Sequence, residues 1–155
     1  MKSIAVLLLV LFFLPVTDLG AQDIMLKKGK YYTSSGDLFS GVHKEYNELG
    51  VMMSELKINA GLLDGISMIY YANGSKKEQR SYHSGKKDGI WISWDEAGNK
   101  LAEAGFKDGR KDGYWYVWDE KGNKRYEMFY QMGEKKGVWL IWDETGKLVT
   151  EQKYD

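Results

Sequence analysis

Glycine recurs in this chain with a fixed step of 24 residues. Three glycine columns keep that step without an insertion, and all of them run in register toward the C-terminus. A fixed period of this length is typical of a repeat architecture in which each unit is one small supersecondary element. The sequence therefore predicts about five 24-residue repeats over residues 41–155. The columns are Gly41, Gly65, Gly89, Gly113 and Gly137; Gly50, Gly74, Gly98, Gly122 and Gly146; and Gly61, Gly85, Gly109 and Gly133.

Each unit contains two apolar-rich segments and two turn signals. The first signal is WDEAG at 94–98, where an Asp followed by a Gly favours a type I turn closed by a left-handed glycine. The second is GKKDG at 85–89, which leads into the next unit. Each unit is therefore expected to be a β-hairpin, and successive hairpins are expected to form an all-β antiparallel meander. Structural turn roles are predicted for Gly65, Gly74, Gly89, Gly98, Gly113, Gly122, Gly137 and Gly146.

The N-terminal part of the chain departs from this pattern. Residues 29–40 carry a Tyr pair and a Ser-Ser-Gly turn, which predicts a partial repeat that caps the array. Residues 22–28 are expected to be a flexible segment.

Alternation along the strands predicts which side chains are buried. The first, third and fifth positions after each unit's first glycine are apolar or aromatic in fourteen of fifteen cases, so they are expected to form one buried face. If the bulged turn keeps the alternation, the returning strand contributes to the same face. The predicted structural core is Trp94, Trp118 and Trp142 with Phe106 and Tyr130.

A second tryptophan column lies on the opposite face, at Trp91, Trp115 and Trp139. The expected cross-strand partners of these side chains are carboxylates, at Glu103, Glu127 and Glu151. An indole N–H beside a carboxylate would stabilise the sheet, which favours a structural ladder. Two alternatives remain at this point: the stripe stacks a glycan or another ligand, or it forms part of a surface for a partner protein.

Composition excludes several classes of function. The chain has 22 basic and 22 acidic residues, and this neutral balance argues against nucleic acid and against anionic lipid as partners. It has no cysteine, so disulfides, thiolate nucleophiles and cysteine-based zinc sites are excluded. His43 and His83 occupy different positions of their units, and no catalytic motif accompanies them. We expect neither an enzyme nor a metal or other cofactor.

The first 21 residues have the layout of a secretory signal peptide. Lys2 precedes an apolar run of 13 residues from Ile4 to Val16, and a small-residue end follows at 17–21. A helix of this length spans about 20 Å, which is short of the roughly 30 Å hydrocarbon core of a bilayer. We expect cleavage after Ala21 and a secreted, periplasmic or cell-envelope protein. A retained N-terminal anchor is the alternative.

Several motifs resemble those of the MORN-repeat variant family. They are Y-x-N-G at 71–74, G-K-K-D-G at 85–89, G-x-W-x-x-W at 89–94, and Glu-x-x-Phe or Glu-x-x-Tyr at 103–106 and 127–130. The likeness covers residues 31–154 and is greatest to bacterial YwqK-type toxin–antitoxin antitoxin proteins. It implies an elongated, twisted, single-layer antiparallel sheet of successive hairpins.

These observations favour a non-catalytic exported scaffold that binds a protein, because a sheet of stacked hairpins offers a long surface and no enclosed pocket. The alternatives are a carbohydrate- or cell-wall-binding module that uses the aromatic stripe, and an antitoxin-like binder of an envelope toxin. The sequence does not indicate an oligomeric state.

Overall fold

The computed structural model describes residues 23–155. The expected signal peptide at 1–21 and its cleavage site lie outside these residues. No helix in the described range is both long and apolar enough to cross a bilayer.

The described residues form fourteen strands. In the first part of the chain they are β1 (Ile24–Lys27), β2 (Lys30–Thr33), β3 (Gly41–Tyr46), β4 (Met52–Asn59), β5 (Leu62–Leu63), β6 (Gly65–Tyr70), β7 (Lys76–His83) and β8 (Lys86–Lys87). In the second part they are β9 (Gly89–Trp94), β10 (Lys100–Lys107), β11 (Arg110–Trp118), β12 (Lys124–Gln131), β13 (Glu134–Trp142) and β14 (Leu148–Tyr154).

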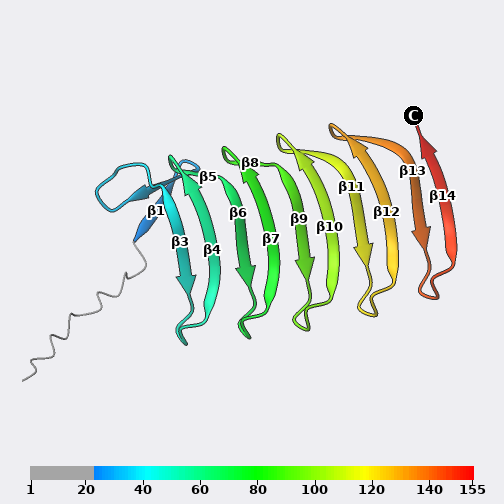
Figure 1. Cartoon of the computed structure of the whole chain (residues 1–155), viewed down its shortest axis with the longest axis horizontal. Coiled ribbons are helices and arrows are strands. Elements are labelled where there is room, and N and C mark those ends of the chain that lie inside the picture. Colours follow the sequence, from blue (N-terminus) through cyan, green and yellow to red (C-terminus); the bar gives the residue numbers. More distant parts are fainter. Residues whose placement is uncertain (1–22) are drawn as a thin grey trace, which may run out of the picture.

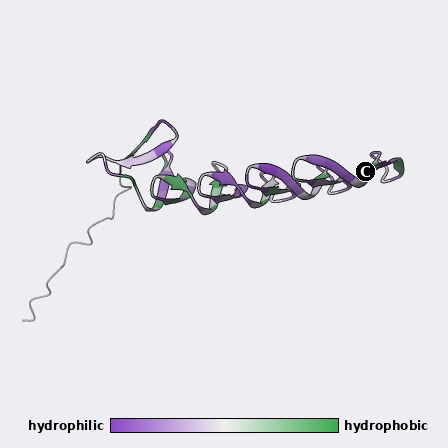
Figure 2. Cartoon of the chain, turned by 90° about the horizontal axis from the view of Figure 1, so that it is seen from above, coloured by the Kyte–Doolittle hydropathy of each residue, from purple (hydrophilic) through white to green (hydrophobic). Residues whose placement is uncertain are grey.

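Strands β3 to β14 form one 12-stranded antiparallel sheet that follows the order of the chain, with the short strands β5 and β8 paired to β4 and β7 beside the main path. Figure 1 shows the hairpins side by side along one axis, and Figure 2 shows the array edge-on as a single layer. The prediction of an all-β antiparallel meander of hairpin repeats is confirmed.

The two turns of each unit differ in type. At the WDEAG turn the Gly98 N–H donates to Asp95 O at 3.1 Å, and Gly98 takes a φ of 89°. At the opposite end Ser84 and Gly85 both have positive φ, 48° and 80°, as a type I′ hairpin turn requires. The turn thus uses only the first glycine of GKKDG, and the two lysines that follow form the short strand β8.

The N-terminal segment is more ordered than the sequence predicts. Strand β1 covers most of the segment expected to be flexible, and it pairs with β2 through a turn at Lys28 and Gly29, both with positive φ. This is the same two-residue turn that joins the later units. Strand β2 contacts the first unit, because Tyr31 N donates to Gly61 O at 2.8 Å.

The register between the two strands of a hairpin overturns the predicted arrangement of faces. Lys100 pairs with Trp94, but Ala102 pairs with Ser93, so Leu101 is an extra, bulged residue. One extra residue moves every following side chain to the opposite face. The residue opposite Trp91 is therefore Ala104, not Glu103.

The same correction holds for the other units. Trp115 faces Met128 and Trp139 faces Gln152, so the predicted pairs with Glu127 and Glu151 are wrong as well. Phe106 and Tyr130 share the face of the Trp91 column instead of the face of Trp94, Trp118 and Trp142. The face that carries Trp91, Trp115 and Trp139 is called the ladder face below, and the opposite one the open face.

A single layer buries few side chains. The buried apolar residues within residues 23–155 are Phe39, Ile58 and Tyr130. Ile58 and Tyr130 lie on the ladder face, and the Phe39 N–H donates to Tyr31 O of the N-terminal hairpin. The sheet is therefore held mainly by its ladder of backbone hydrogen bonds and by half-buried side chains on its two faces.

Candidate binding surfaces

Seven aromatic rings form a continuous row along the ladder face. Successive ring centroids lie between 4.8 and 5.5 Å apart, and every pair is tilted or edge-to-face, which is the favourable geometry for aromatic pairs. The row alternates between the tryptophan column and the aromatic near the end of each returning strand. Its members are Tyr82, Trp91, Phe106, Trp115, Tyr130, Trp139 and Tyr154.

The indole N–H groups of this row already have acceptors. Trp91 Nε1 donates to Ser81 O at 2.8 Å, and Trp115 Nε1 donates to Gly105 O at 2.9 Å. Trp139 Nε1 donates to Phe129 O at 3.1 Å. The acceptor in each unit is a backbone carbonyl ten residues earlier, where the sequence predicts a carboxylate. Each indole thereby joins its own unit to the preceding one.

Lysine side chains cover the same row of rings. Lys87 Nζ lies 4.1 Å from the centroid of Trp91, and Lys111 Nζ lies 4.2 Å from that of Trp115. Lys135 Nζ lies 4.6 Å from that of Trp139. Each of these lysines stands four residues before a tryptophan and so follows the same 24-residue period. Because each tryptophan of the row has a bonded indole N–H and a lysine over its ring, the row has the features of a structural ladder.

One part of the ladder face remains hollow. Small side chains at Ala102 and Ala104 leave a space of about 310 Å³ between Trp91 and Trp115. Its lining is mainly apolar, and the Glu78 carboxylate at its side accepts the Arg80 Nε–H at 2.7 Å.

The predicted glutamates lie on the open face. Glu103 forms an ion pair with Lys100 and Glu127 with Lys124, each at 2.7 Å. Tyr116 lies between these two carboxylates in the strand pairing, and burial followed by the nearby Glu127 charge raises the pKa of its phenol. Glu103 and Glu127 are thus paired with lysines of the same sheet and do not form a column of unpaired carboxylates.

The open face carries a periodic apolar column that the sequence predicts to be buried. This prediction is wrong at the first position of every unit, because a single-layer sheet has no second layer to cover that face. The exposed fractions are Val42 50%, Ile66 44%, Ile90 44%, Tyr114 52% and Val138 42%.

The core tryptophans Trp94, Trp118 and Trp142 are half-buried at the turn end of the open face. Tyr116 packs against Trp118 with ring centroids 5.7 Å apart, and Lys124 Nζ lies 5.6 Å from the centroid of Trp142. The three tryptophans are thus partly accessible and belong to the same apolar surface as the exposed column of the open face.

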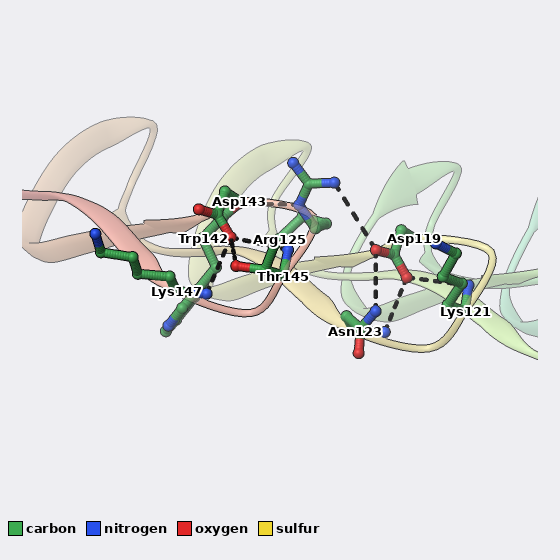
Figure 3. A network of polar contacts seen from close by, with 8 residues as sticks. All are labelled: Asp119, Lys121, Asn123, Arg125, Trp142, Asp143, Thr145 and Lys147. Carbon is green, nitrogen blue, oxygen red and sulfur yellow. Dashed lines mark hydrogen bonds and ion pairs between the residues drawn. The ribbon is translucent and has the colours of Figure 1, made fainter.

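A polar network joins neighbouring turns at this end of the sheet (Figure 3). Arg125 Nε donates to Trp142 O at 2.9 Å, and its guanidinium lies 3.8 Å from the Asp119 carboxylate. Asp143 accepts the Thr145 hydroxyl at 2.6 Å and the Lys147 N–H at 3.0 Å. The Asp119 and Asp143 carboxylates therefore stabilise the turns in which they lie.

The histidines stand apart from each other in the fold. His43 lies on β3 beside Glu45 at 3.8 Å, and His83 lies at the end of β7 beside Asp64 at 3.5 Å. Within residues 23–155 no group of three or more His, Asp or Glu side chains is placed to hold a metal ion.

The units also match a known family. A family model described as the MORN repeat variant matches residues 63–84, 87–108, 111–132 and 135–155, which together make up more than half of the chain. The first unit, which contains His43, lies outside the matched segments. No curated protein matches the sequence.

Proposed function

The chain belongs to the MORN repeat variant family, and we propose that it is a non-catalytic scaffold whose open face binds another protein. Repeats of this kind are generally protein or membrane interaction modules, and the family is typically non-catalytic. The observation that carries the proposal is the periodic apolar column, in which every member is 42–52% exposed. An extended apolar patch on a soluble surface marks an interaction site.

The spacing of this column favours an α-helix as the bound element. Neighbouring strands lie about 4.8 Å apart, so successive units repeat roughly every 10 Å across the sheet. Seven residues of an α-helix rise about 10.5 Å. A helix that lies across the strands and carries an apolar residue at every seventh position would therefore place one such residue against each unit.

The charges on the open face agree with an apolar contact. Glu55, Glu103 and Glu127 already form ion pairs with Lys44, Lys100 and Lys124, at 3.4, 2.7 and 2.7 Å. These pairs offer little net charge to a partner, so the column itself is the main source of binding free energy. The proposed partner is a protein with an amphipathic helix.

Site-specific photo-crosslinking tests this proposal. A benzophenone side chain placed at Ile90 and, separately, at Tyr114 should react with one partner protein, at sites about seven residues apart in one helix. The double variant I90E/Y114E, labelled at Val138, should lose the adduct. A benzophenone at Leu49, which is 87% exposed on the turn of the first unit, is the matched control and should give no such adduct. Equal labelling from Leu49, or sites scattered over unrelated segments, would refute the helix assignment.

We also propose that the partner lies outside the cytoplasm, because residues 1–21 have the layout of a signal peptide. N-terminal sequencing of the protein purified from its own cells should then begin at Gln22. A mature chain that begins at Met1 and remains in the cytoplasm would refute the proposed export. That result would not bear on the open-face proposal, which photo-crosslinking tests separately.

A further inference from the structure

The tryptophan column stops before the N-terminal units. Ser67 and His43 occupy the positions that Trp91 holds in the third unit. Where Ser67 replaces the indole, a pocket of about 220 Å³ opens on the ladder face. Tyr82, the first ring of the aromatic row, forms one of its walls. The pocket is thus a direct consequence of the missing tryptophan.

The N-terminal hairpin completes this pocket. Tyr31, on β2, contributes its side chain to the lining. The position of β2 is fixed by three backbone bonds, from Tyr31 N to Gly61 O, from Phe39 N to Tyr31 O and from Gly61 N to Phe39 O, at 2.8, 3.0 and 2.8 Å. A Cβ at Gly61 would lie 3.0 Å from Tyr31 O, so glycine permits this close approach. The C-terminal units have no equivalent of this cover within the described part of the chain.

Hydroxyl groups converge on the pocket. Ser67 and Ser54 are only 1% and 4% exposed, and both line it together with the Tyr31 and Tyr82 phenols. Burial raises the pKa of both phenols further above neutral pH, so both can donate a hydrogen bond there. The pocket therefore presents a set of groups that both donate and accept hydrogen bonds.

One of these hydroxyls lacks an acceptor. Within residues 23–155 the hydrogen bond formed by Ser67 Oγ is one that it accepts from Lys57 N, at 3.4 Å. Its own proton is thus not donated to any described protein group. His43 Nδ1, on the same face of the adjoining hairpin, is also buried without a partner among these residues. The Ser67 hydroxyl can therefore donate a hydrogen bond to a molecule bound in the pocket, where buried polar groups normally find partners.

The two charged groups of the pocket are already engaged. Arg80 donates its Nε–H to Glu78 at 2.7 Å, and Glu45 accepts the Ser54 hydroxyl at 2.7 Å. Both groups therefore have polar partners, although the partner of Glu45 is a neutral hydroxyl. Leu56, Leu63 and Ile69 supply apolar lining. This combination of hydroxyls, already bonded charged groups and an apolar floor suits a neutral ligand with many hydroxyls and an apolar C–H face.

We propose that the pocket beneath Tyr31 binds one sugar ring. The ligand is a neutral hexose or hexosamine derivative, either free or at the end of a glycan chain. This site lies on the ladder face, at the N-terminal end of the aromatic row, and not on the open face, so it does not depend on the protein-binding proposal.

Calorimetry and heteronuclear NMR titrations test the proposal. The probes are glucose, galactose, mannose and N-acetylglucosamine as free sugars, maltotriose and chitotriose as chain ends, and glycine as a small zwitterion. At least one sugar should bind saturably below about 10 mM, a Kd that corresponds to roughly 2.7 kcal/mol. The amide signals of Ser54, Ser67 and Arg80 should shift. Tighter binding of the trisaccharides identifies a chain end as the ligand, and binding of the monosaccharides alone identifies a free sugar.

Two variants at one position locate the site. S67W fills the pocket and should abolish sugar binding, whereas I90W adds the same side chain to the open face and should leave it unchanged. S67A keeps the shape but removes the hydroxyl, and should weaken binding about tenfold, the value of one hydrogen bond. Binding that survives S67W, saturation by glycine in place of any sugar, or no saturable sugar binding by the folded wild-type chain would each overturn the assignment.

Discussion

The two N-terminal units and the three C-terminal units carry different side chains at equivalent positions of one face. In the C-terminal units a tryptophan is accompanied by a lysine four residues earlier, as Trp91 is by Lys87, whose Nζ lies 4.1 Å from the ring centroid. In the second unit the same two positions are Ser67 and Leu63. The second unit therefore has a hydroxyl and an apolar side chain where the C-terminal units have an indole and an ammonium group. A repeat of fixed length can thus carry either a row of rings or a hydroxyl-lined pocket, according to the two side chains at these positions.

The strands differ between the two regions as well. Residues 86–87 form the separate strand β8, which ends before β9 begins at Gly89, whereas the corresponding residues of the next unit are the start of the continuous strand β11. The facing strands also differ at one position. Ser81 has a side chain where β10 has Gly105, and a Cβ at Gly105 would lie 2.1 Å from Asp112 O. Glycine there allows Asp112 O to approach β10 closely, whereas β13 is equally continuous opposite Phe129.

Removing one ring of the ladder should have the largest effect. Trp115→Ala deletes contacts with Phe106 and Tyr130, at centroid distances of 5.2 and 5.5 Å, and leaves Gly105 O without its indole donor. The free energy of unfolding should fall by about 3 kcal/mol, measured by urea denaturation. Ser67→Ala, at the same position of the second unit, should change it by less than about 1 kcal/mol. Similar losses in the two variants would refute the contrast between ladder and pocket.

The substitution of Gly105 by alanine should have the second-largest effect on stability. Gly105→Ala forces a methyl group against Asp112 O and should lower the free energy of unfolding by about 2 kcal/mol. Hydrogen exchange should rise in residues 110–113, because the start of β11 would separate from β10. Ser81→Ala is the matched control, since β8 and β9 already accommodate a side chain there. Tolerance of Gly105→Ala with unchanged exchange would show that the close approach does not keep β11 continuous.

The sequence contains enough information to predict the hairpins and their order. Turn chemistry at Asp95 and Gly98 is local, and the 24-residue period repeats it in every unit, so errors in one unit are corrected by the others. Even the N-terminal hairpin has a local signal, because Lys28 and Gly29 form the same two-residue turn as Ser84 and Gly85. That signal falls outside the period and is therefore easily missed.

The faces could not be predicted with the same reliability. The extra residue at Leu101 depends on how the turn joins its strands, and a shift of one residue exchanged Phe106 between the two faces. Apolar alternation at Ile90 and Tyr114 also indicates only that these side chains share a face. Whether another layer covers that face is a property of the whole fold, and here none of the described residues does so.

The lysine and tryptophan of the C-terminal units can be introduced into the second unit to test whether the two side chains act together. Leu63→Lys alone places a charge beside the pocket without a ring, and Ser67→Trp alone crowds an indole against Leu63. The double variant restores both the ring and its lysine, so it should be more stable than the two single effects predict, by about 1 kcal/mol. A double-mutant cycle from denaturant unfolding measures this coupling. Strict additivity would mean that the introduced lysine and tryptophan do not stabilise each other at these positions.

Acid should act on the turns of the C-terminal units only, and this is the smallest expected effect. Bonds from the Asn99 side chain and then its backbone N–H lower the pKa of Asp95, and those from the Thr145 hydroxyl and the Lys147 N–H lower that of Asp143. A lowered carboxyl pKa gives stability that is complete above the ordinary value of 3.8 and is lost as the pH falls through the lowered one. In the first unit this position is Asn47, which does not titrate and whose Oδ1 accepts the Val51 N–H at 2.9 Å.

The amide proton shifts of Asn99 and Lys147 should therefore titrate with midpoints below 3.8, while that of Val51 stays constant over the same range. NMR spectra recorded from neutral pH downward give all three curves in one series. Replacing Asp95 by Asn should remove the Asn99 titration and leave that of Lys147, since the two turns belong to different units. If Val51 moved together with the other two amides, the change would reflect the whole sheet opening in acid, and the turns would not be the origin of the difference between the two regions.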